Sequence, residues 1–303
     1  MTFPVLDWAE YQSNPVGFAR QLGAACRETG FFLLKGHGLR ERQIADVFTA
    51  AANFFAQSED AKRPLSIATN PHNRGWAYLG SESLDEHSGK TDRKEAFNIG
   101  LDLAADDPRV LAAEPFRGVN LWPDLPGFRE TMLEYFSHVW ALGVGLLQPV
   151  ARDLGLPPNH FAPFFDAPMA TLRLLSYPAA SGAVGEIGAG AHTDYGALTL
   201  LLTDGAPGLQ LRPRGGDWLD VPHMPGAFVV NIGDCLMRWT NDLYVSTPHR
   251  VLPPPRPRQS VAFFLDPNPD ALITALPGTG PAKYPGVTGA EYLHARLSAT
   301  YKT

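Results

Sequence analysis

The chain has 303 residues, of which 45% are hydrophobic and 18% are charged, with 25 basic and 31 acidic side chains. The charged fraction lies below the ~25% usual for soluble domains, which indicates a chain that forms a core and excludes a disordered one. The net charge is −6 and Lys and Arg are not clustered. We therefore expect neither nucleic acid nor an anionic membrane surface as the main partner.

The cysteines and the apolar runs bear on where the protein works. Cys26 and Cys235 lie far apart and follow no zinc-type spacing, which excludes a disulfide scaffold and favours a reducing compartment. The longest uncharged apolar run, residues 139–147, is much shorter than the ~20 residues of a membrane helix. The N-terminus shows no signal-peptide pattern. We expect a cytoplasmic protein.

The first half of the chain predicts helices and one early strand. Asn14 and Pro15 are typical of a helix start, and Gly30 is typical of its end. A short buried strand is expected over residues 31–34. Apolar residues then follow helical spacing over residues 44–55, which predicts a further helix.

Two longer segments complete the first half. Residues 68–121 show no sustained period, so we expect long loops with short elements, and long ordered loops are usually functional. Residues 128–154 follow helical spacing strongly and predict a long helix, kinked or split at Pro149.

The second half has a different pattern, in which short segments rich in Leu, Val and Phe alternate with turn residues. The predicted strands are residues 171–177, 197–203, 209–212, 218–221, 227–232, 249–252 and 260–266. This spacing indicates an antiparallel sandwich or barrel. No linker separates the halves, so we expect a single domain over residues 1–303. Its mostly helical and loop part, 1–156, would pack on a β-rich core, 157–303.

His192 and Asp194 are two residues apart, and both are suited to binding a metal ion. If this stretch is extended, the two side chains project to the same face of a strand. One more His would complete the two-His-one-carboxylate set that suits iron(II) and leaves positions open for a cosubstrate and dioxygen. His249 opens another predicted strand and is the candidate for the third ligand.

Arg258 and Ser260 form a second pair on one strand face, nine residues after His249. A guanidinium beside a hydroxyl suits a carboxylate. Burying Arg258 inside a barrel would be costly without an anion to neutralise it, so an inward Arg258 implies an acidic ligand. Arg173 shares strand parity with Tyr177, so both side chains are expected on one face. Arg173 then either pairs with a carboxylate at the edge of the core or contacts substrate.

These motifs resemble those of the iron(II)- and 2-oxoglutarate-dependent dioxygenases of the isopenicillin N synthase-like family. The resemblance rests on His-Thr-Asp at 192–194, Ser-Thr-Pro-His-Arg-Val at 246–251 and Arg-Gln-Ser at 258–260. Further matching stretches follow in family order over nearly the whole chain, at residues 30–38, 74–82, 92–97, 120–123, 172–178 and 233–242.

The resemblance implies a fold and a set of roles. The fold would be mainly β with flanking helices and a double-stranded β-helix (jelly-roll) core. Iron(II) would bind to His192, Asp194 and His249. The distal carboxylate of 2-oxoglutarate would bind to Arg258 and Ser260, with Tyr177 nearby. Many members have Asn two residues before this Tyr, where this chain has Leu175.

The resemblance also implies a reaction. A single catalytic domain would use iron(II), 2-oxoglutarate and dioxygen to hydroxylate, desaturate or cyclise a small organic molecule, releasing succinate and carbon dioxide. Two alternatives stay open: an isopenicillin N synthase-type oxidase that uses no 2-oxoglutarate, and a non-enzymatic metal-binding jelly roll. Arg74, Tyr78 and Arg173 are candidate substrate residues, which hints at a polar or carboxylate-bearing substrate. We expect a monomer or a weak homo-oligomer.

Overall fold

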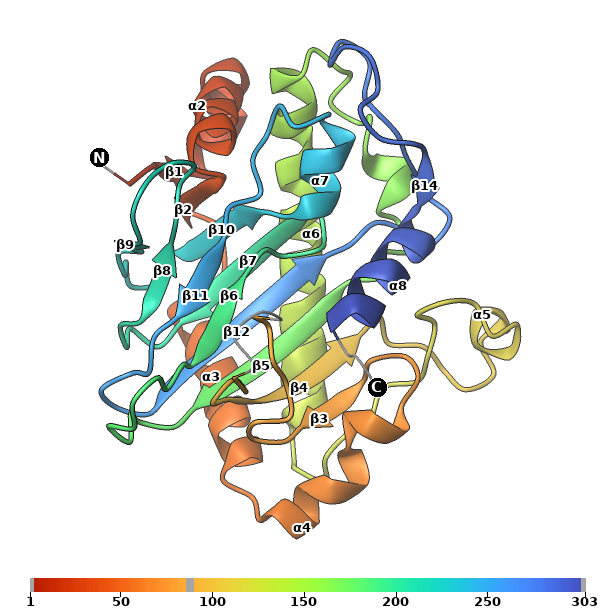
Figure 1. Ribbon diagram of the computed structural model, residues 1–303. Helices are drawn as coiled ribbons and strands as arrows, with labels where there is room; N and C mark the ends of the chain where they lie inside the picture. Colours follow the sequence, from red (N-terminus) through yellow and green to blue (C-terminus); the bar gives the residue numbers. More distant parts are fainter. Residues whose placement is uncertain (1–2, 86–89, 301–303) are drawn as a thin grey trace.

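The computed structural model describes residues 3–85 and 90–300, which form two main β-sheets with helices packed outside them (Figure 1). The large sheet has the strand order β1-β2-β10-β7-β12-β5-β4-β3, the smaller one β6-β11-β8-β9, and β13 pairs with β14. The strands are β1 (Val5–Asp7), β2 (Phe31–Lys35), β3 (Gly75–Ala77), β4 (Glu95–Gly100), β5 (Thr171–Tyr177), β6 (Ala189–His192), β7 (Leu198–Thr203), β8 (Leu209–Leu211), β9 (Leu219–Asp220), β10 (Phe228–Ile232), β11 (His249–Val251), β12 (Arg258–Leu265), β13 (Leu272–Ile273) and β14 (Val287–Thr288).

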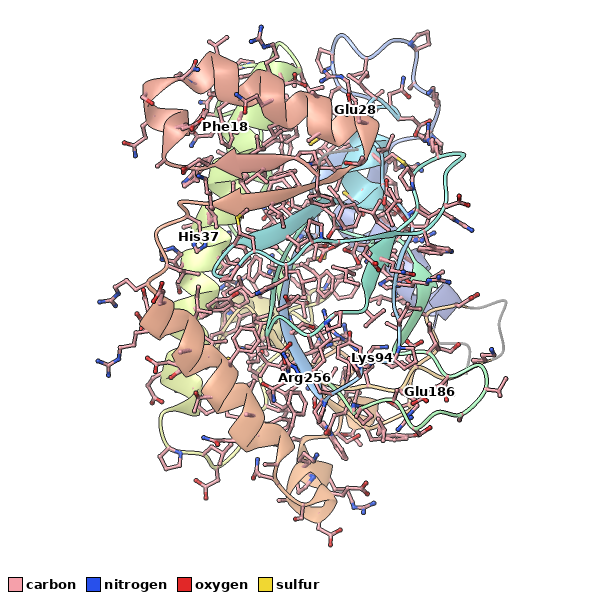
Figure 2. All side chains as sticks on the ribbon, turned by 90° about the vertical axis from the view of Figure 1, so that its left-hand side faces the viewer. Phe18, Glu28, His37, Lys94, Glu186 and Arg256 are labelled. Carbon is pink, nitrogen blue, oxygen red and sulfur yellow. The ribbon has the colours of Figure 1, made fainter. Side chains whose placement is uncertain are left out.

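The described part of the chain also forms eight α-helices. They are α1 (Glu10–Ser13), α2 (Pro15–Glu28), α3 (Glu41–Phe55), α4 (Glu59–Lys62), α5 (Pro108–Leu111), α6 (Phe128–Asp153), α7 (Asp234–Trp239) and α8 (Gly289–Thr300). The long helix α6 runs behind the sheet and contacts α2, α3, β7 and β12 (Figure 1). In a view turned by 90°, helix α2, which carries Phe18 and Glu28, lies at one end of the molecule, and Lys94 and Glu186 lie toward the other end (Figure 2). No helix within the described ranges is long and apolar enough to cross a membrane.

The local signals at the start and end of α2 act as expected. The Asn14 side chain accepts a hydrogen bond from the backbone N–H of Gly17 at 3.0 Å, and Pro15 takes the first helical position. Gly30 follows the helix with φ of +67°, a left-handed conformation that favours glycine. The expected split of the long helix at Pro149 is wrong. Helix α6 continues to Asp153 because Pro149 lies near its end and removes only one N–H.

The central strands divide their side chains between two cores with a period of two. Along β12, Val261, Phe263 and Leu265 pack toward the helices, while Ser260 and Ala262 face the smaller sheet. Strands β5, β7 and β10 alternate in the same way. One core therefore lies between the helices and the large sheet. The other lies between the two sheets, where a cavity opens.

The seven strands expected in the second half are all present, and the structure adds strands that the pattern did not predict. Strand β4 lies within the region expected to be loops, and pairs with β5 along its whole length. Strand β1 was not predicted either, and together with β2, which was expected over residues 31–34, it continues the sheet beyond β10. The first half therefore supplies both edges of the large sheet as well as its helical cover.

Candidate active site

The cavity between the two sheets is lined by the inward side chains of β5, β7 and β12 on one side and by β6, β8 and β11 on the other. Its wall also includes loop residues such as Asn73, Glu82 and Phe116, and Leu293 and Leu297 of α8. Loops of the first half and the last helix therefore both contribute to the wall of the cavity.

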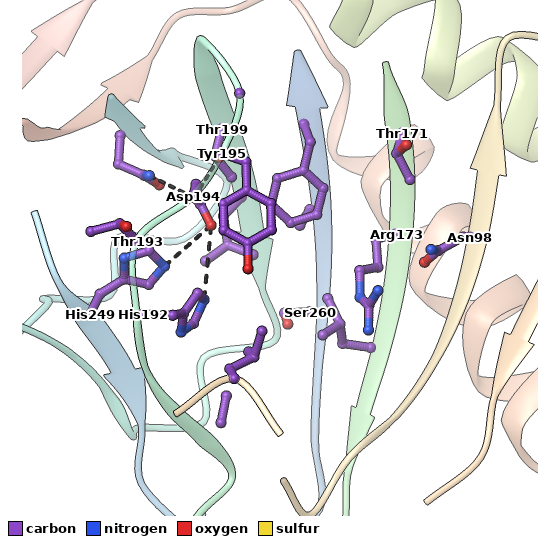
Figure 3. Close-up of a pocket in the computed structure, with 18 of the residues that line it drawn as sticks. Asn98, Thr171, Arg173, His192, Thr193, Asp194, Tyr195, Thr199, His249 and Ser260 are labelled. Atoms are coloured by element: carbon purple, nitrogen blue, oxygen red, sulfur yellow. Dashed lines mark hydrogen bonds and ion pairs between the residues drawn. The ribbon is translucent and has the colours of Figure 1, made fainter. Parts of the chain in front are cut away.

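His192, Asp194 and His249 converge at this cavity, as Figure 3 shows. One potential ligand atom from each lies within 4.8 Å of the others. The Nε2 atoms of His192 and His249 lie 3.9 and 3.6 Å from Oδ1 of Asp194. The two histidines are direct partners across the antiparallel pair β6–β11, which explains how residues so far apart in sequence meet. Asp194 differs from the expectation, because β6 ends at His192 and Asp194 lies in the following loop.

Backbone contacts orient both imidazole rings. Nδ1 of His192 lies 2.7 Å from the Gly190 carbonyl oxygen, and Nδ1 of His249 lies 3.2 Å from that of Thr247. Because a carbonyl oxygen only accepts, each Nδ1 carries the proton and each Nε2 is left with a lone pair. Burial and the neighbouring His249 lower the pKa of His192 to about 3, so its ring is neutral at ordinary pH.

The carboxylate of Asp194 is fixed by two side chains that the sequence motifs did not reveal. Oδ2 accepts hydrogen bonds from Thr199 Oγ1 at 2.6 Å and from Asn231 Nδ2 at 2.7 Å. Burial alone would raise the pKa of Asp194, but the two histidines and Asn231 outweigh it and hold this pKa below its ordinary value. A polar residue within the apolar run of β10 was the available signal for Asn231.

Arg258 and Ser260 lie deeper in the same cavity, on adjacent inward positions of β12. Arg258 is only 1% exposed, donates from Nη1 to Ser260 Oγ at 3.2 Å, and places its guanidinium 4.9 Å from the ring centre of Tyr177. Tyr177 is the direct partner of Arg258 on β5. Leu175 also lines the cavity.

Arg173 faces the cavity as its parity predicted, and it is part of a buried charge network. Its guanidinium pairs with Glu82, which is also 3.2 Å from Lys94 Nζ, and Lys94 pairs with Asp92. Asp92 Oδ1 further accepts the backbone N–H of Gly190 at 2.8 Å, just ahead of His192. The salt bridge and the cavity position considered for Arg173 thus occur together.

The structure separates the two other candidate substrate residues. Arg74 is buried and lines the cavity, where its guanidinium donates to the carbonyl oxygens of His72 and Phe116 at 2.9 and 3.4 Å. Tyr78 is 55% exposed and is not among the residues that line the cavity. It directly follows the short strand β3.

Helix α8 is tied to the metal-binding loop through Asp234. Arg296 lies 2.9 Å from Asp234 Oδ2, and the same oxygen accepts a hydrogen bond from Thr193 Oγ1 at 3.0 Å. Thr193 stands between His192 and Asp194 in sequence. The helix that closes one wall of the cavity is therefore held to the segment between two of the candidate metal ligands, His192 and Asp194.

The donor set fits iron(II) and an anionic cosubstrate. Two neutral imidazole nitrogens and one carboxylate oxygen converge on one point, and the cavity leaves space on one side of them. Within the described residues, no carboxylate pairs with Arg258, and its Nε has no hydrogen-bond partner. A buried guanidinium in this state fits an anionic ligand.

Comparisons with known proteins agree with this geometry. Residues 165–267 match the model of the 2OG-Fe(II) oxygenase superfamily, and residues 3–125 match that of the non-haem dioxygenase in morphine synthesis N-terminal region. A 2-oxoglutarate-dependent dioxygenase of Didymella fabae is 38% identical over 91% of this chain and 88% of its own length.

Solved structures show the same similarity. A full-length Neurospora crassa protein, crystallised with alpha-KG and thymine, is 32% identical, with a TM-score of 0.87 over 99% of this chain and 97% of that one. A putative 2OG-Fe(II) oxygenase family protein of Caulobacter crescentus is 30% identical, with a TM-score of 0.87 over 98% of this chain and 99% of its own. The chain therefore belongs to the 2OG-Fe(II) oxygenase superfamily, has its jelly-roll core, and is an oxygenase dependent on iron(II) and 2-oxoglutarate.

Proposed function

We propose that His192, Asp194 and His249 hold iron(II), and that Arg258 with Ser260 binds the distal carboxylate of 2-oxoglutarate. The observation that carries this proposal is the buried Arg258, which faces the cavity of the three ligands without a carboxylate partner in the described part of the chain. A guanidinium pairs with a carboxylate through two parallel hydrogen bonds, and Ser260 adds a third donor.

The bound iron(II) and 2-oxoglutarate would supply the oxidising chemistry, in which dioxygen is activated for attack on a substrate C–H bond while succinate and carbon dioxide form. The chain's own residues would orient the metal ligands and shield the site from water. Gly190 and Thr247 hold the imidazole rings, Thr199 and Asn231 hold the carboxylate, and the apolar inner faces of the sheets limit water.

We propose that the substrate is a small organic molecule that is hydroxylated, desaturated or cyclised in the part of the cavity beyond Ser260, away from Arg258. The thymine bound in the Neurospora crassa structure supports a small substrate. The two buried free cysteines support a cytoplasmic location. We also propose that the protein is a monomer or a weak homo-oligomer.

The test of the cosubstrate site is Arg258→Gln. Losing one partner of a buried charged pair costs roughly 2–5 kcal/mol, so 2-oxoglutarate affinity should fall about 30- to several-thousand-fold. Anaerobic titration of the iron(II)-loaded protein with 2-oxoglutarate, followed by its charge-transfer absorption, measures this affinity. Iron binding should persist, and succinate release without substrate should fall in parallel.

Arg256→Gln is the matched control. Arg256 lies two residues earlier, at the surface, where it pairs with Asp204 at 3.2 Å. Its replacement should leave 2-oxoglutarate affinity unchanged. Equal affinity in wild type and Arg258→Gln would show that the cosubstrate is anchored elsewhere.

A further inference from the structure

Strand β12 carries a polar group at each end of its cavity face. Every second residue of the strand and of its continuation lines the cavity: Arg258, Ser260, Ala262, Phe264 and Asp266. Eight residues at ~3.3 Å each separate Arg258 from Asp266 by roughly 26 Å. The proposed function uses the Arg258 end and assigns no role to Asp266.

Asp266 is a buried carboxyl group without a partner. It is 6% exposed, and within the described residues no group donates a hydrogen bond to its side chain or forms an ion pair with it. It packs beside Gly196, where a Cβ would lie 2.9 Å from Oδ1. Burial, with Asp194 adding to it and Arg74 opposing it, raises the pKa of Asp266 to about 7. Its carboxylate oxygens are not among the fully buried atoms that lack a partner, and they remain accessible to a molecule in the cavity.

Arg74 and Asn98 bring further unsatisfied atoms to the same end of the cavity. Gly100, Thr171 and Phe264 are in register across β4, β5 and β12. A Cβ at Gly100 would overlap the Arg74 guanidinium, so this guanidinium lies directly over the row formed by these three residues. Asp266 follows Phe264 by two residues and lies just past the end of the row. Arg74 Nε and Asn98 Oδ1 are buried and lack a hydrogen-bond partner in the described part of the chain.

The cations near this end are already engaged. Lys94 pairs with Asp92 and Glu82, Arg173 pairs with Glu82, and the Arg74 guanidinium donates to two backbone carbonyl groups. A substrate carboxylate would therefore meet Asp266 while the neighbouring guanidinium and ammonium groups are occupied. Arg74 differs from Arg258 because a carboxylate acts on it: Asp266 and Arg74 each favour the charged form of the other, so their two charges compensate. This end of the cavity therefore disfavours an anionic substrate and favours a neutral one with hydrogen-bonding groups.

We propose that Asp266 is a substrate-binding residue that accepts a hydrogen bond from an N–H group of a neutral amide, lactam or imide. Such molecules present N–H and C=O side by side, which matches the acceptors on Asp266 and Asn98 and the donor on Arg74. This inference rests on the proposed function and names its substrate class. It replaces the carboxylate-bearing substrate that the sequence hinted at.

The test uses the full-length protein loaded with iron(II) and 2-oxoglutarate under anaerobic conditions. The probes are thymine and uracil, 1,3-dimethyluracil, which lacks both N–H groups, and uracil-6-carboxylate, which adds a negative charge. Binding is followed by the change in the charge-transfer absorption and by calorimetry. We expect thymine or uracil to bind at least about 10-fold more tightly than the dimethyl and carboxylate probes. The dimethyl probe cannot donate a hydrogen bond to Asp266, and the carboxylate probe brings a second negative charge close to it.

The variants are Asp266→Ala, Asp266→Asn and the control Asp270→Asn, which changes an exposed residue of the same segment. Asp266→Ala should weaken binding of the N–H probes about 10- to 100-fold and leave 2-oxoglutarate affinity unchanged. Asp266→Asn should shift the preference toward uracil-6-carboxylate by removing the negative charge, and Asp270→Asn should change neither quantity.

The outcomes separate the two proposals. If wild-type protein fails to bind 2-oxoglutarate, the proposed function is at fault. If 2-oxoglutarate binds but neither N–H probe does, or the dimethyl or carboxylate probe binds as well as uracil, the substrate class is refuted. Should Asp266→Ala not fold, the selectivity of Asp266→Asn decides: an unchanged ratio of uracil to carboxylate binding removes Asp266 from the substrate site.

Discussion

Asp194 uses its two carboxylate oxygens differently. Oδ1 faces the two histidines, while Oδ2 accepts hydrogen bonds from Thr199 and Asn231. Groups that orient a metal ligand in this way typically contribute 10–100-fold to metal affinity. The geometry of the candidate iron site therefore depends on residues that cannot themselves bind iron in this arrangement.

Thr199→Val keeps the shape of the side chain but removes its hydroxyl, so Asp194 should lose part of its orientation. We expect iron(II) affinity to fall about 10- to 100-fold, measured by anaerobic titration. Thr203→Val is the control. Thr203 lies on the same strand as Thr199, but its hydroxyl contacts the exposed His223 at 3.2 Å and not Asp194. If both variants bind iron like wild type, Thr199 does not position Asp194.

The pH dependence of iron binding should follow His249. Burial alone would lower the pKa of His249, but Asp194 outweighs it and the pKa is raised above its ordinary value. Iron requires the neutral ring, so below its raised pKa His249 must lose a proton on binding, whereas His192, with a pKa of about 3, has none to lose.

Iron affinity should therefore decrease as pH falls through the raised pKa of His249, by up to about tenfold per pH unit, and level off at higher pH. Titrations between about pH 5 and 8 measure the slope. Calorimetry in two buffers of different ionisation enthalpy counts the released proton. A flat profile over this range would contradict the coupling between His249 and Asp194.

At the scale of elements, a buried ion cluster connects the loop before β4 to the strand that carries His192. Lys94 and Asp92 have side chains 2% and 1% exposed, and Glu82 and Arg173 complete the cluster. Because Asp92 also accepts the N–H of Gly190, this cluster fixes the start of β6 against the loop. Its members cannot be removed singly without leaving a buried charge unpaired.

Lys94→Met should destabilise the fold by about 3–5 kcal/mol, because it leaves Asp92 and Glu82 without their shared cation. Urea unfolding followed by circular dichroism gives the free energy of unfolding. Lys35→Met, at an exposed pair with Asp7, should cost at most about 1 kcal/mol. Equal effects of the two substitutions would show that the buried cluster contributes no more than a surface pair.

At the scale of the whole molecule, the large sheet combines strands from both halves of the chain. Strands β1 and β2 lie beyond β10 at one edge, and β4 and β3 lie beyond β5 at the other. The apolar face of β12 is covered by α6 and α3 from the first half. The β-rich second half by itself would expose that face and both of its sheet edges to water.

We predict that residues 1–303 unfold as one domain and that residues 157–303 alone do not fold. Urea transitions followed by tryptophan fluorescence and by circular dichroism should coincide. The isolated fragment should show no cooperative transition. A fragment 157–303 that unfolds cooperatively and binds iron(II) would refute the single-domain prediction.

The sequence by itself determined seven strands of the second half, the three long helices α2, α3 and α6 of the first half, and the family. These depend on local properties: the period of apolar residues, the Asn-Pro start of α2, and spacings such as those of His192 with Asp194 and Arg258 with Ser260. Strand parity also placed Arg173 and Tyr177 on the cavity face, because successive side chains on a strand must alternate.

Only the tertiary structure decided which distant residues meet. Strand register sets His249 opposite His192, and it puts Thr199 and Asn231 within hydrogen-bond distance of Asp194. Loop paths placed Arg74 inside the cavity and Tyr78 outside it, and the row of β4, β5 and β12 brought Arg74 near Asp266. Such contacts depend on pairing between segments far apart in the chain, and no local period in a single sequence encodes that pairing.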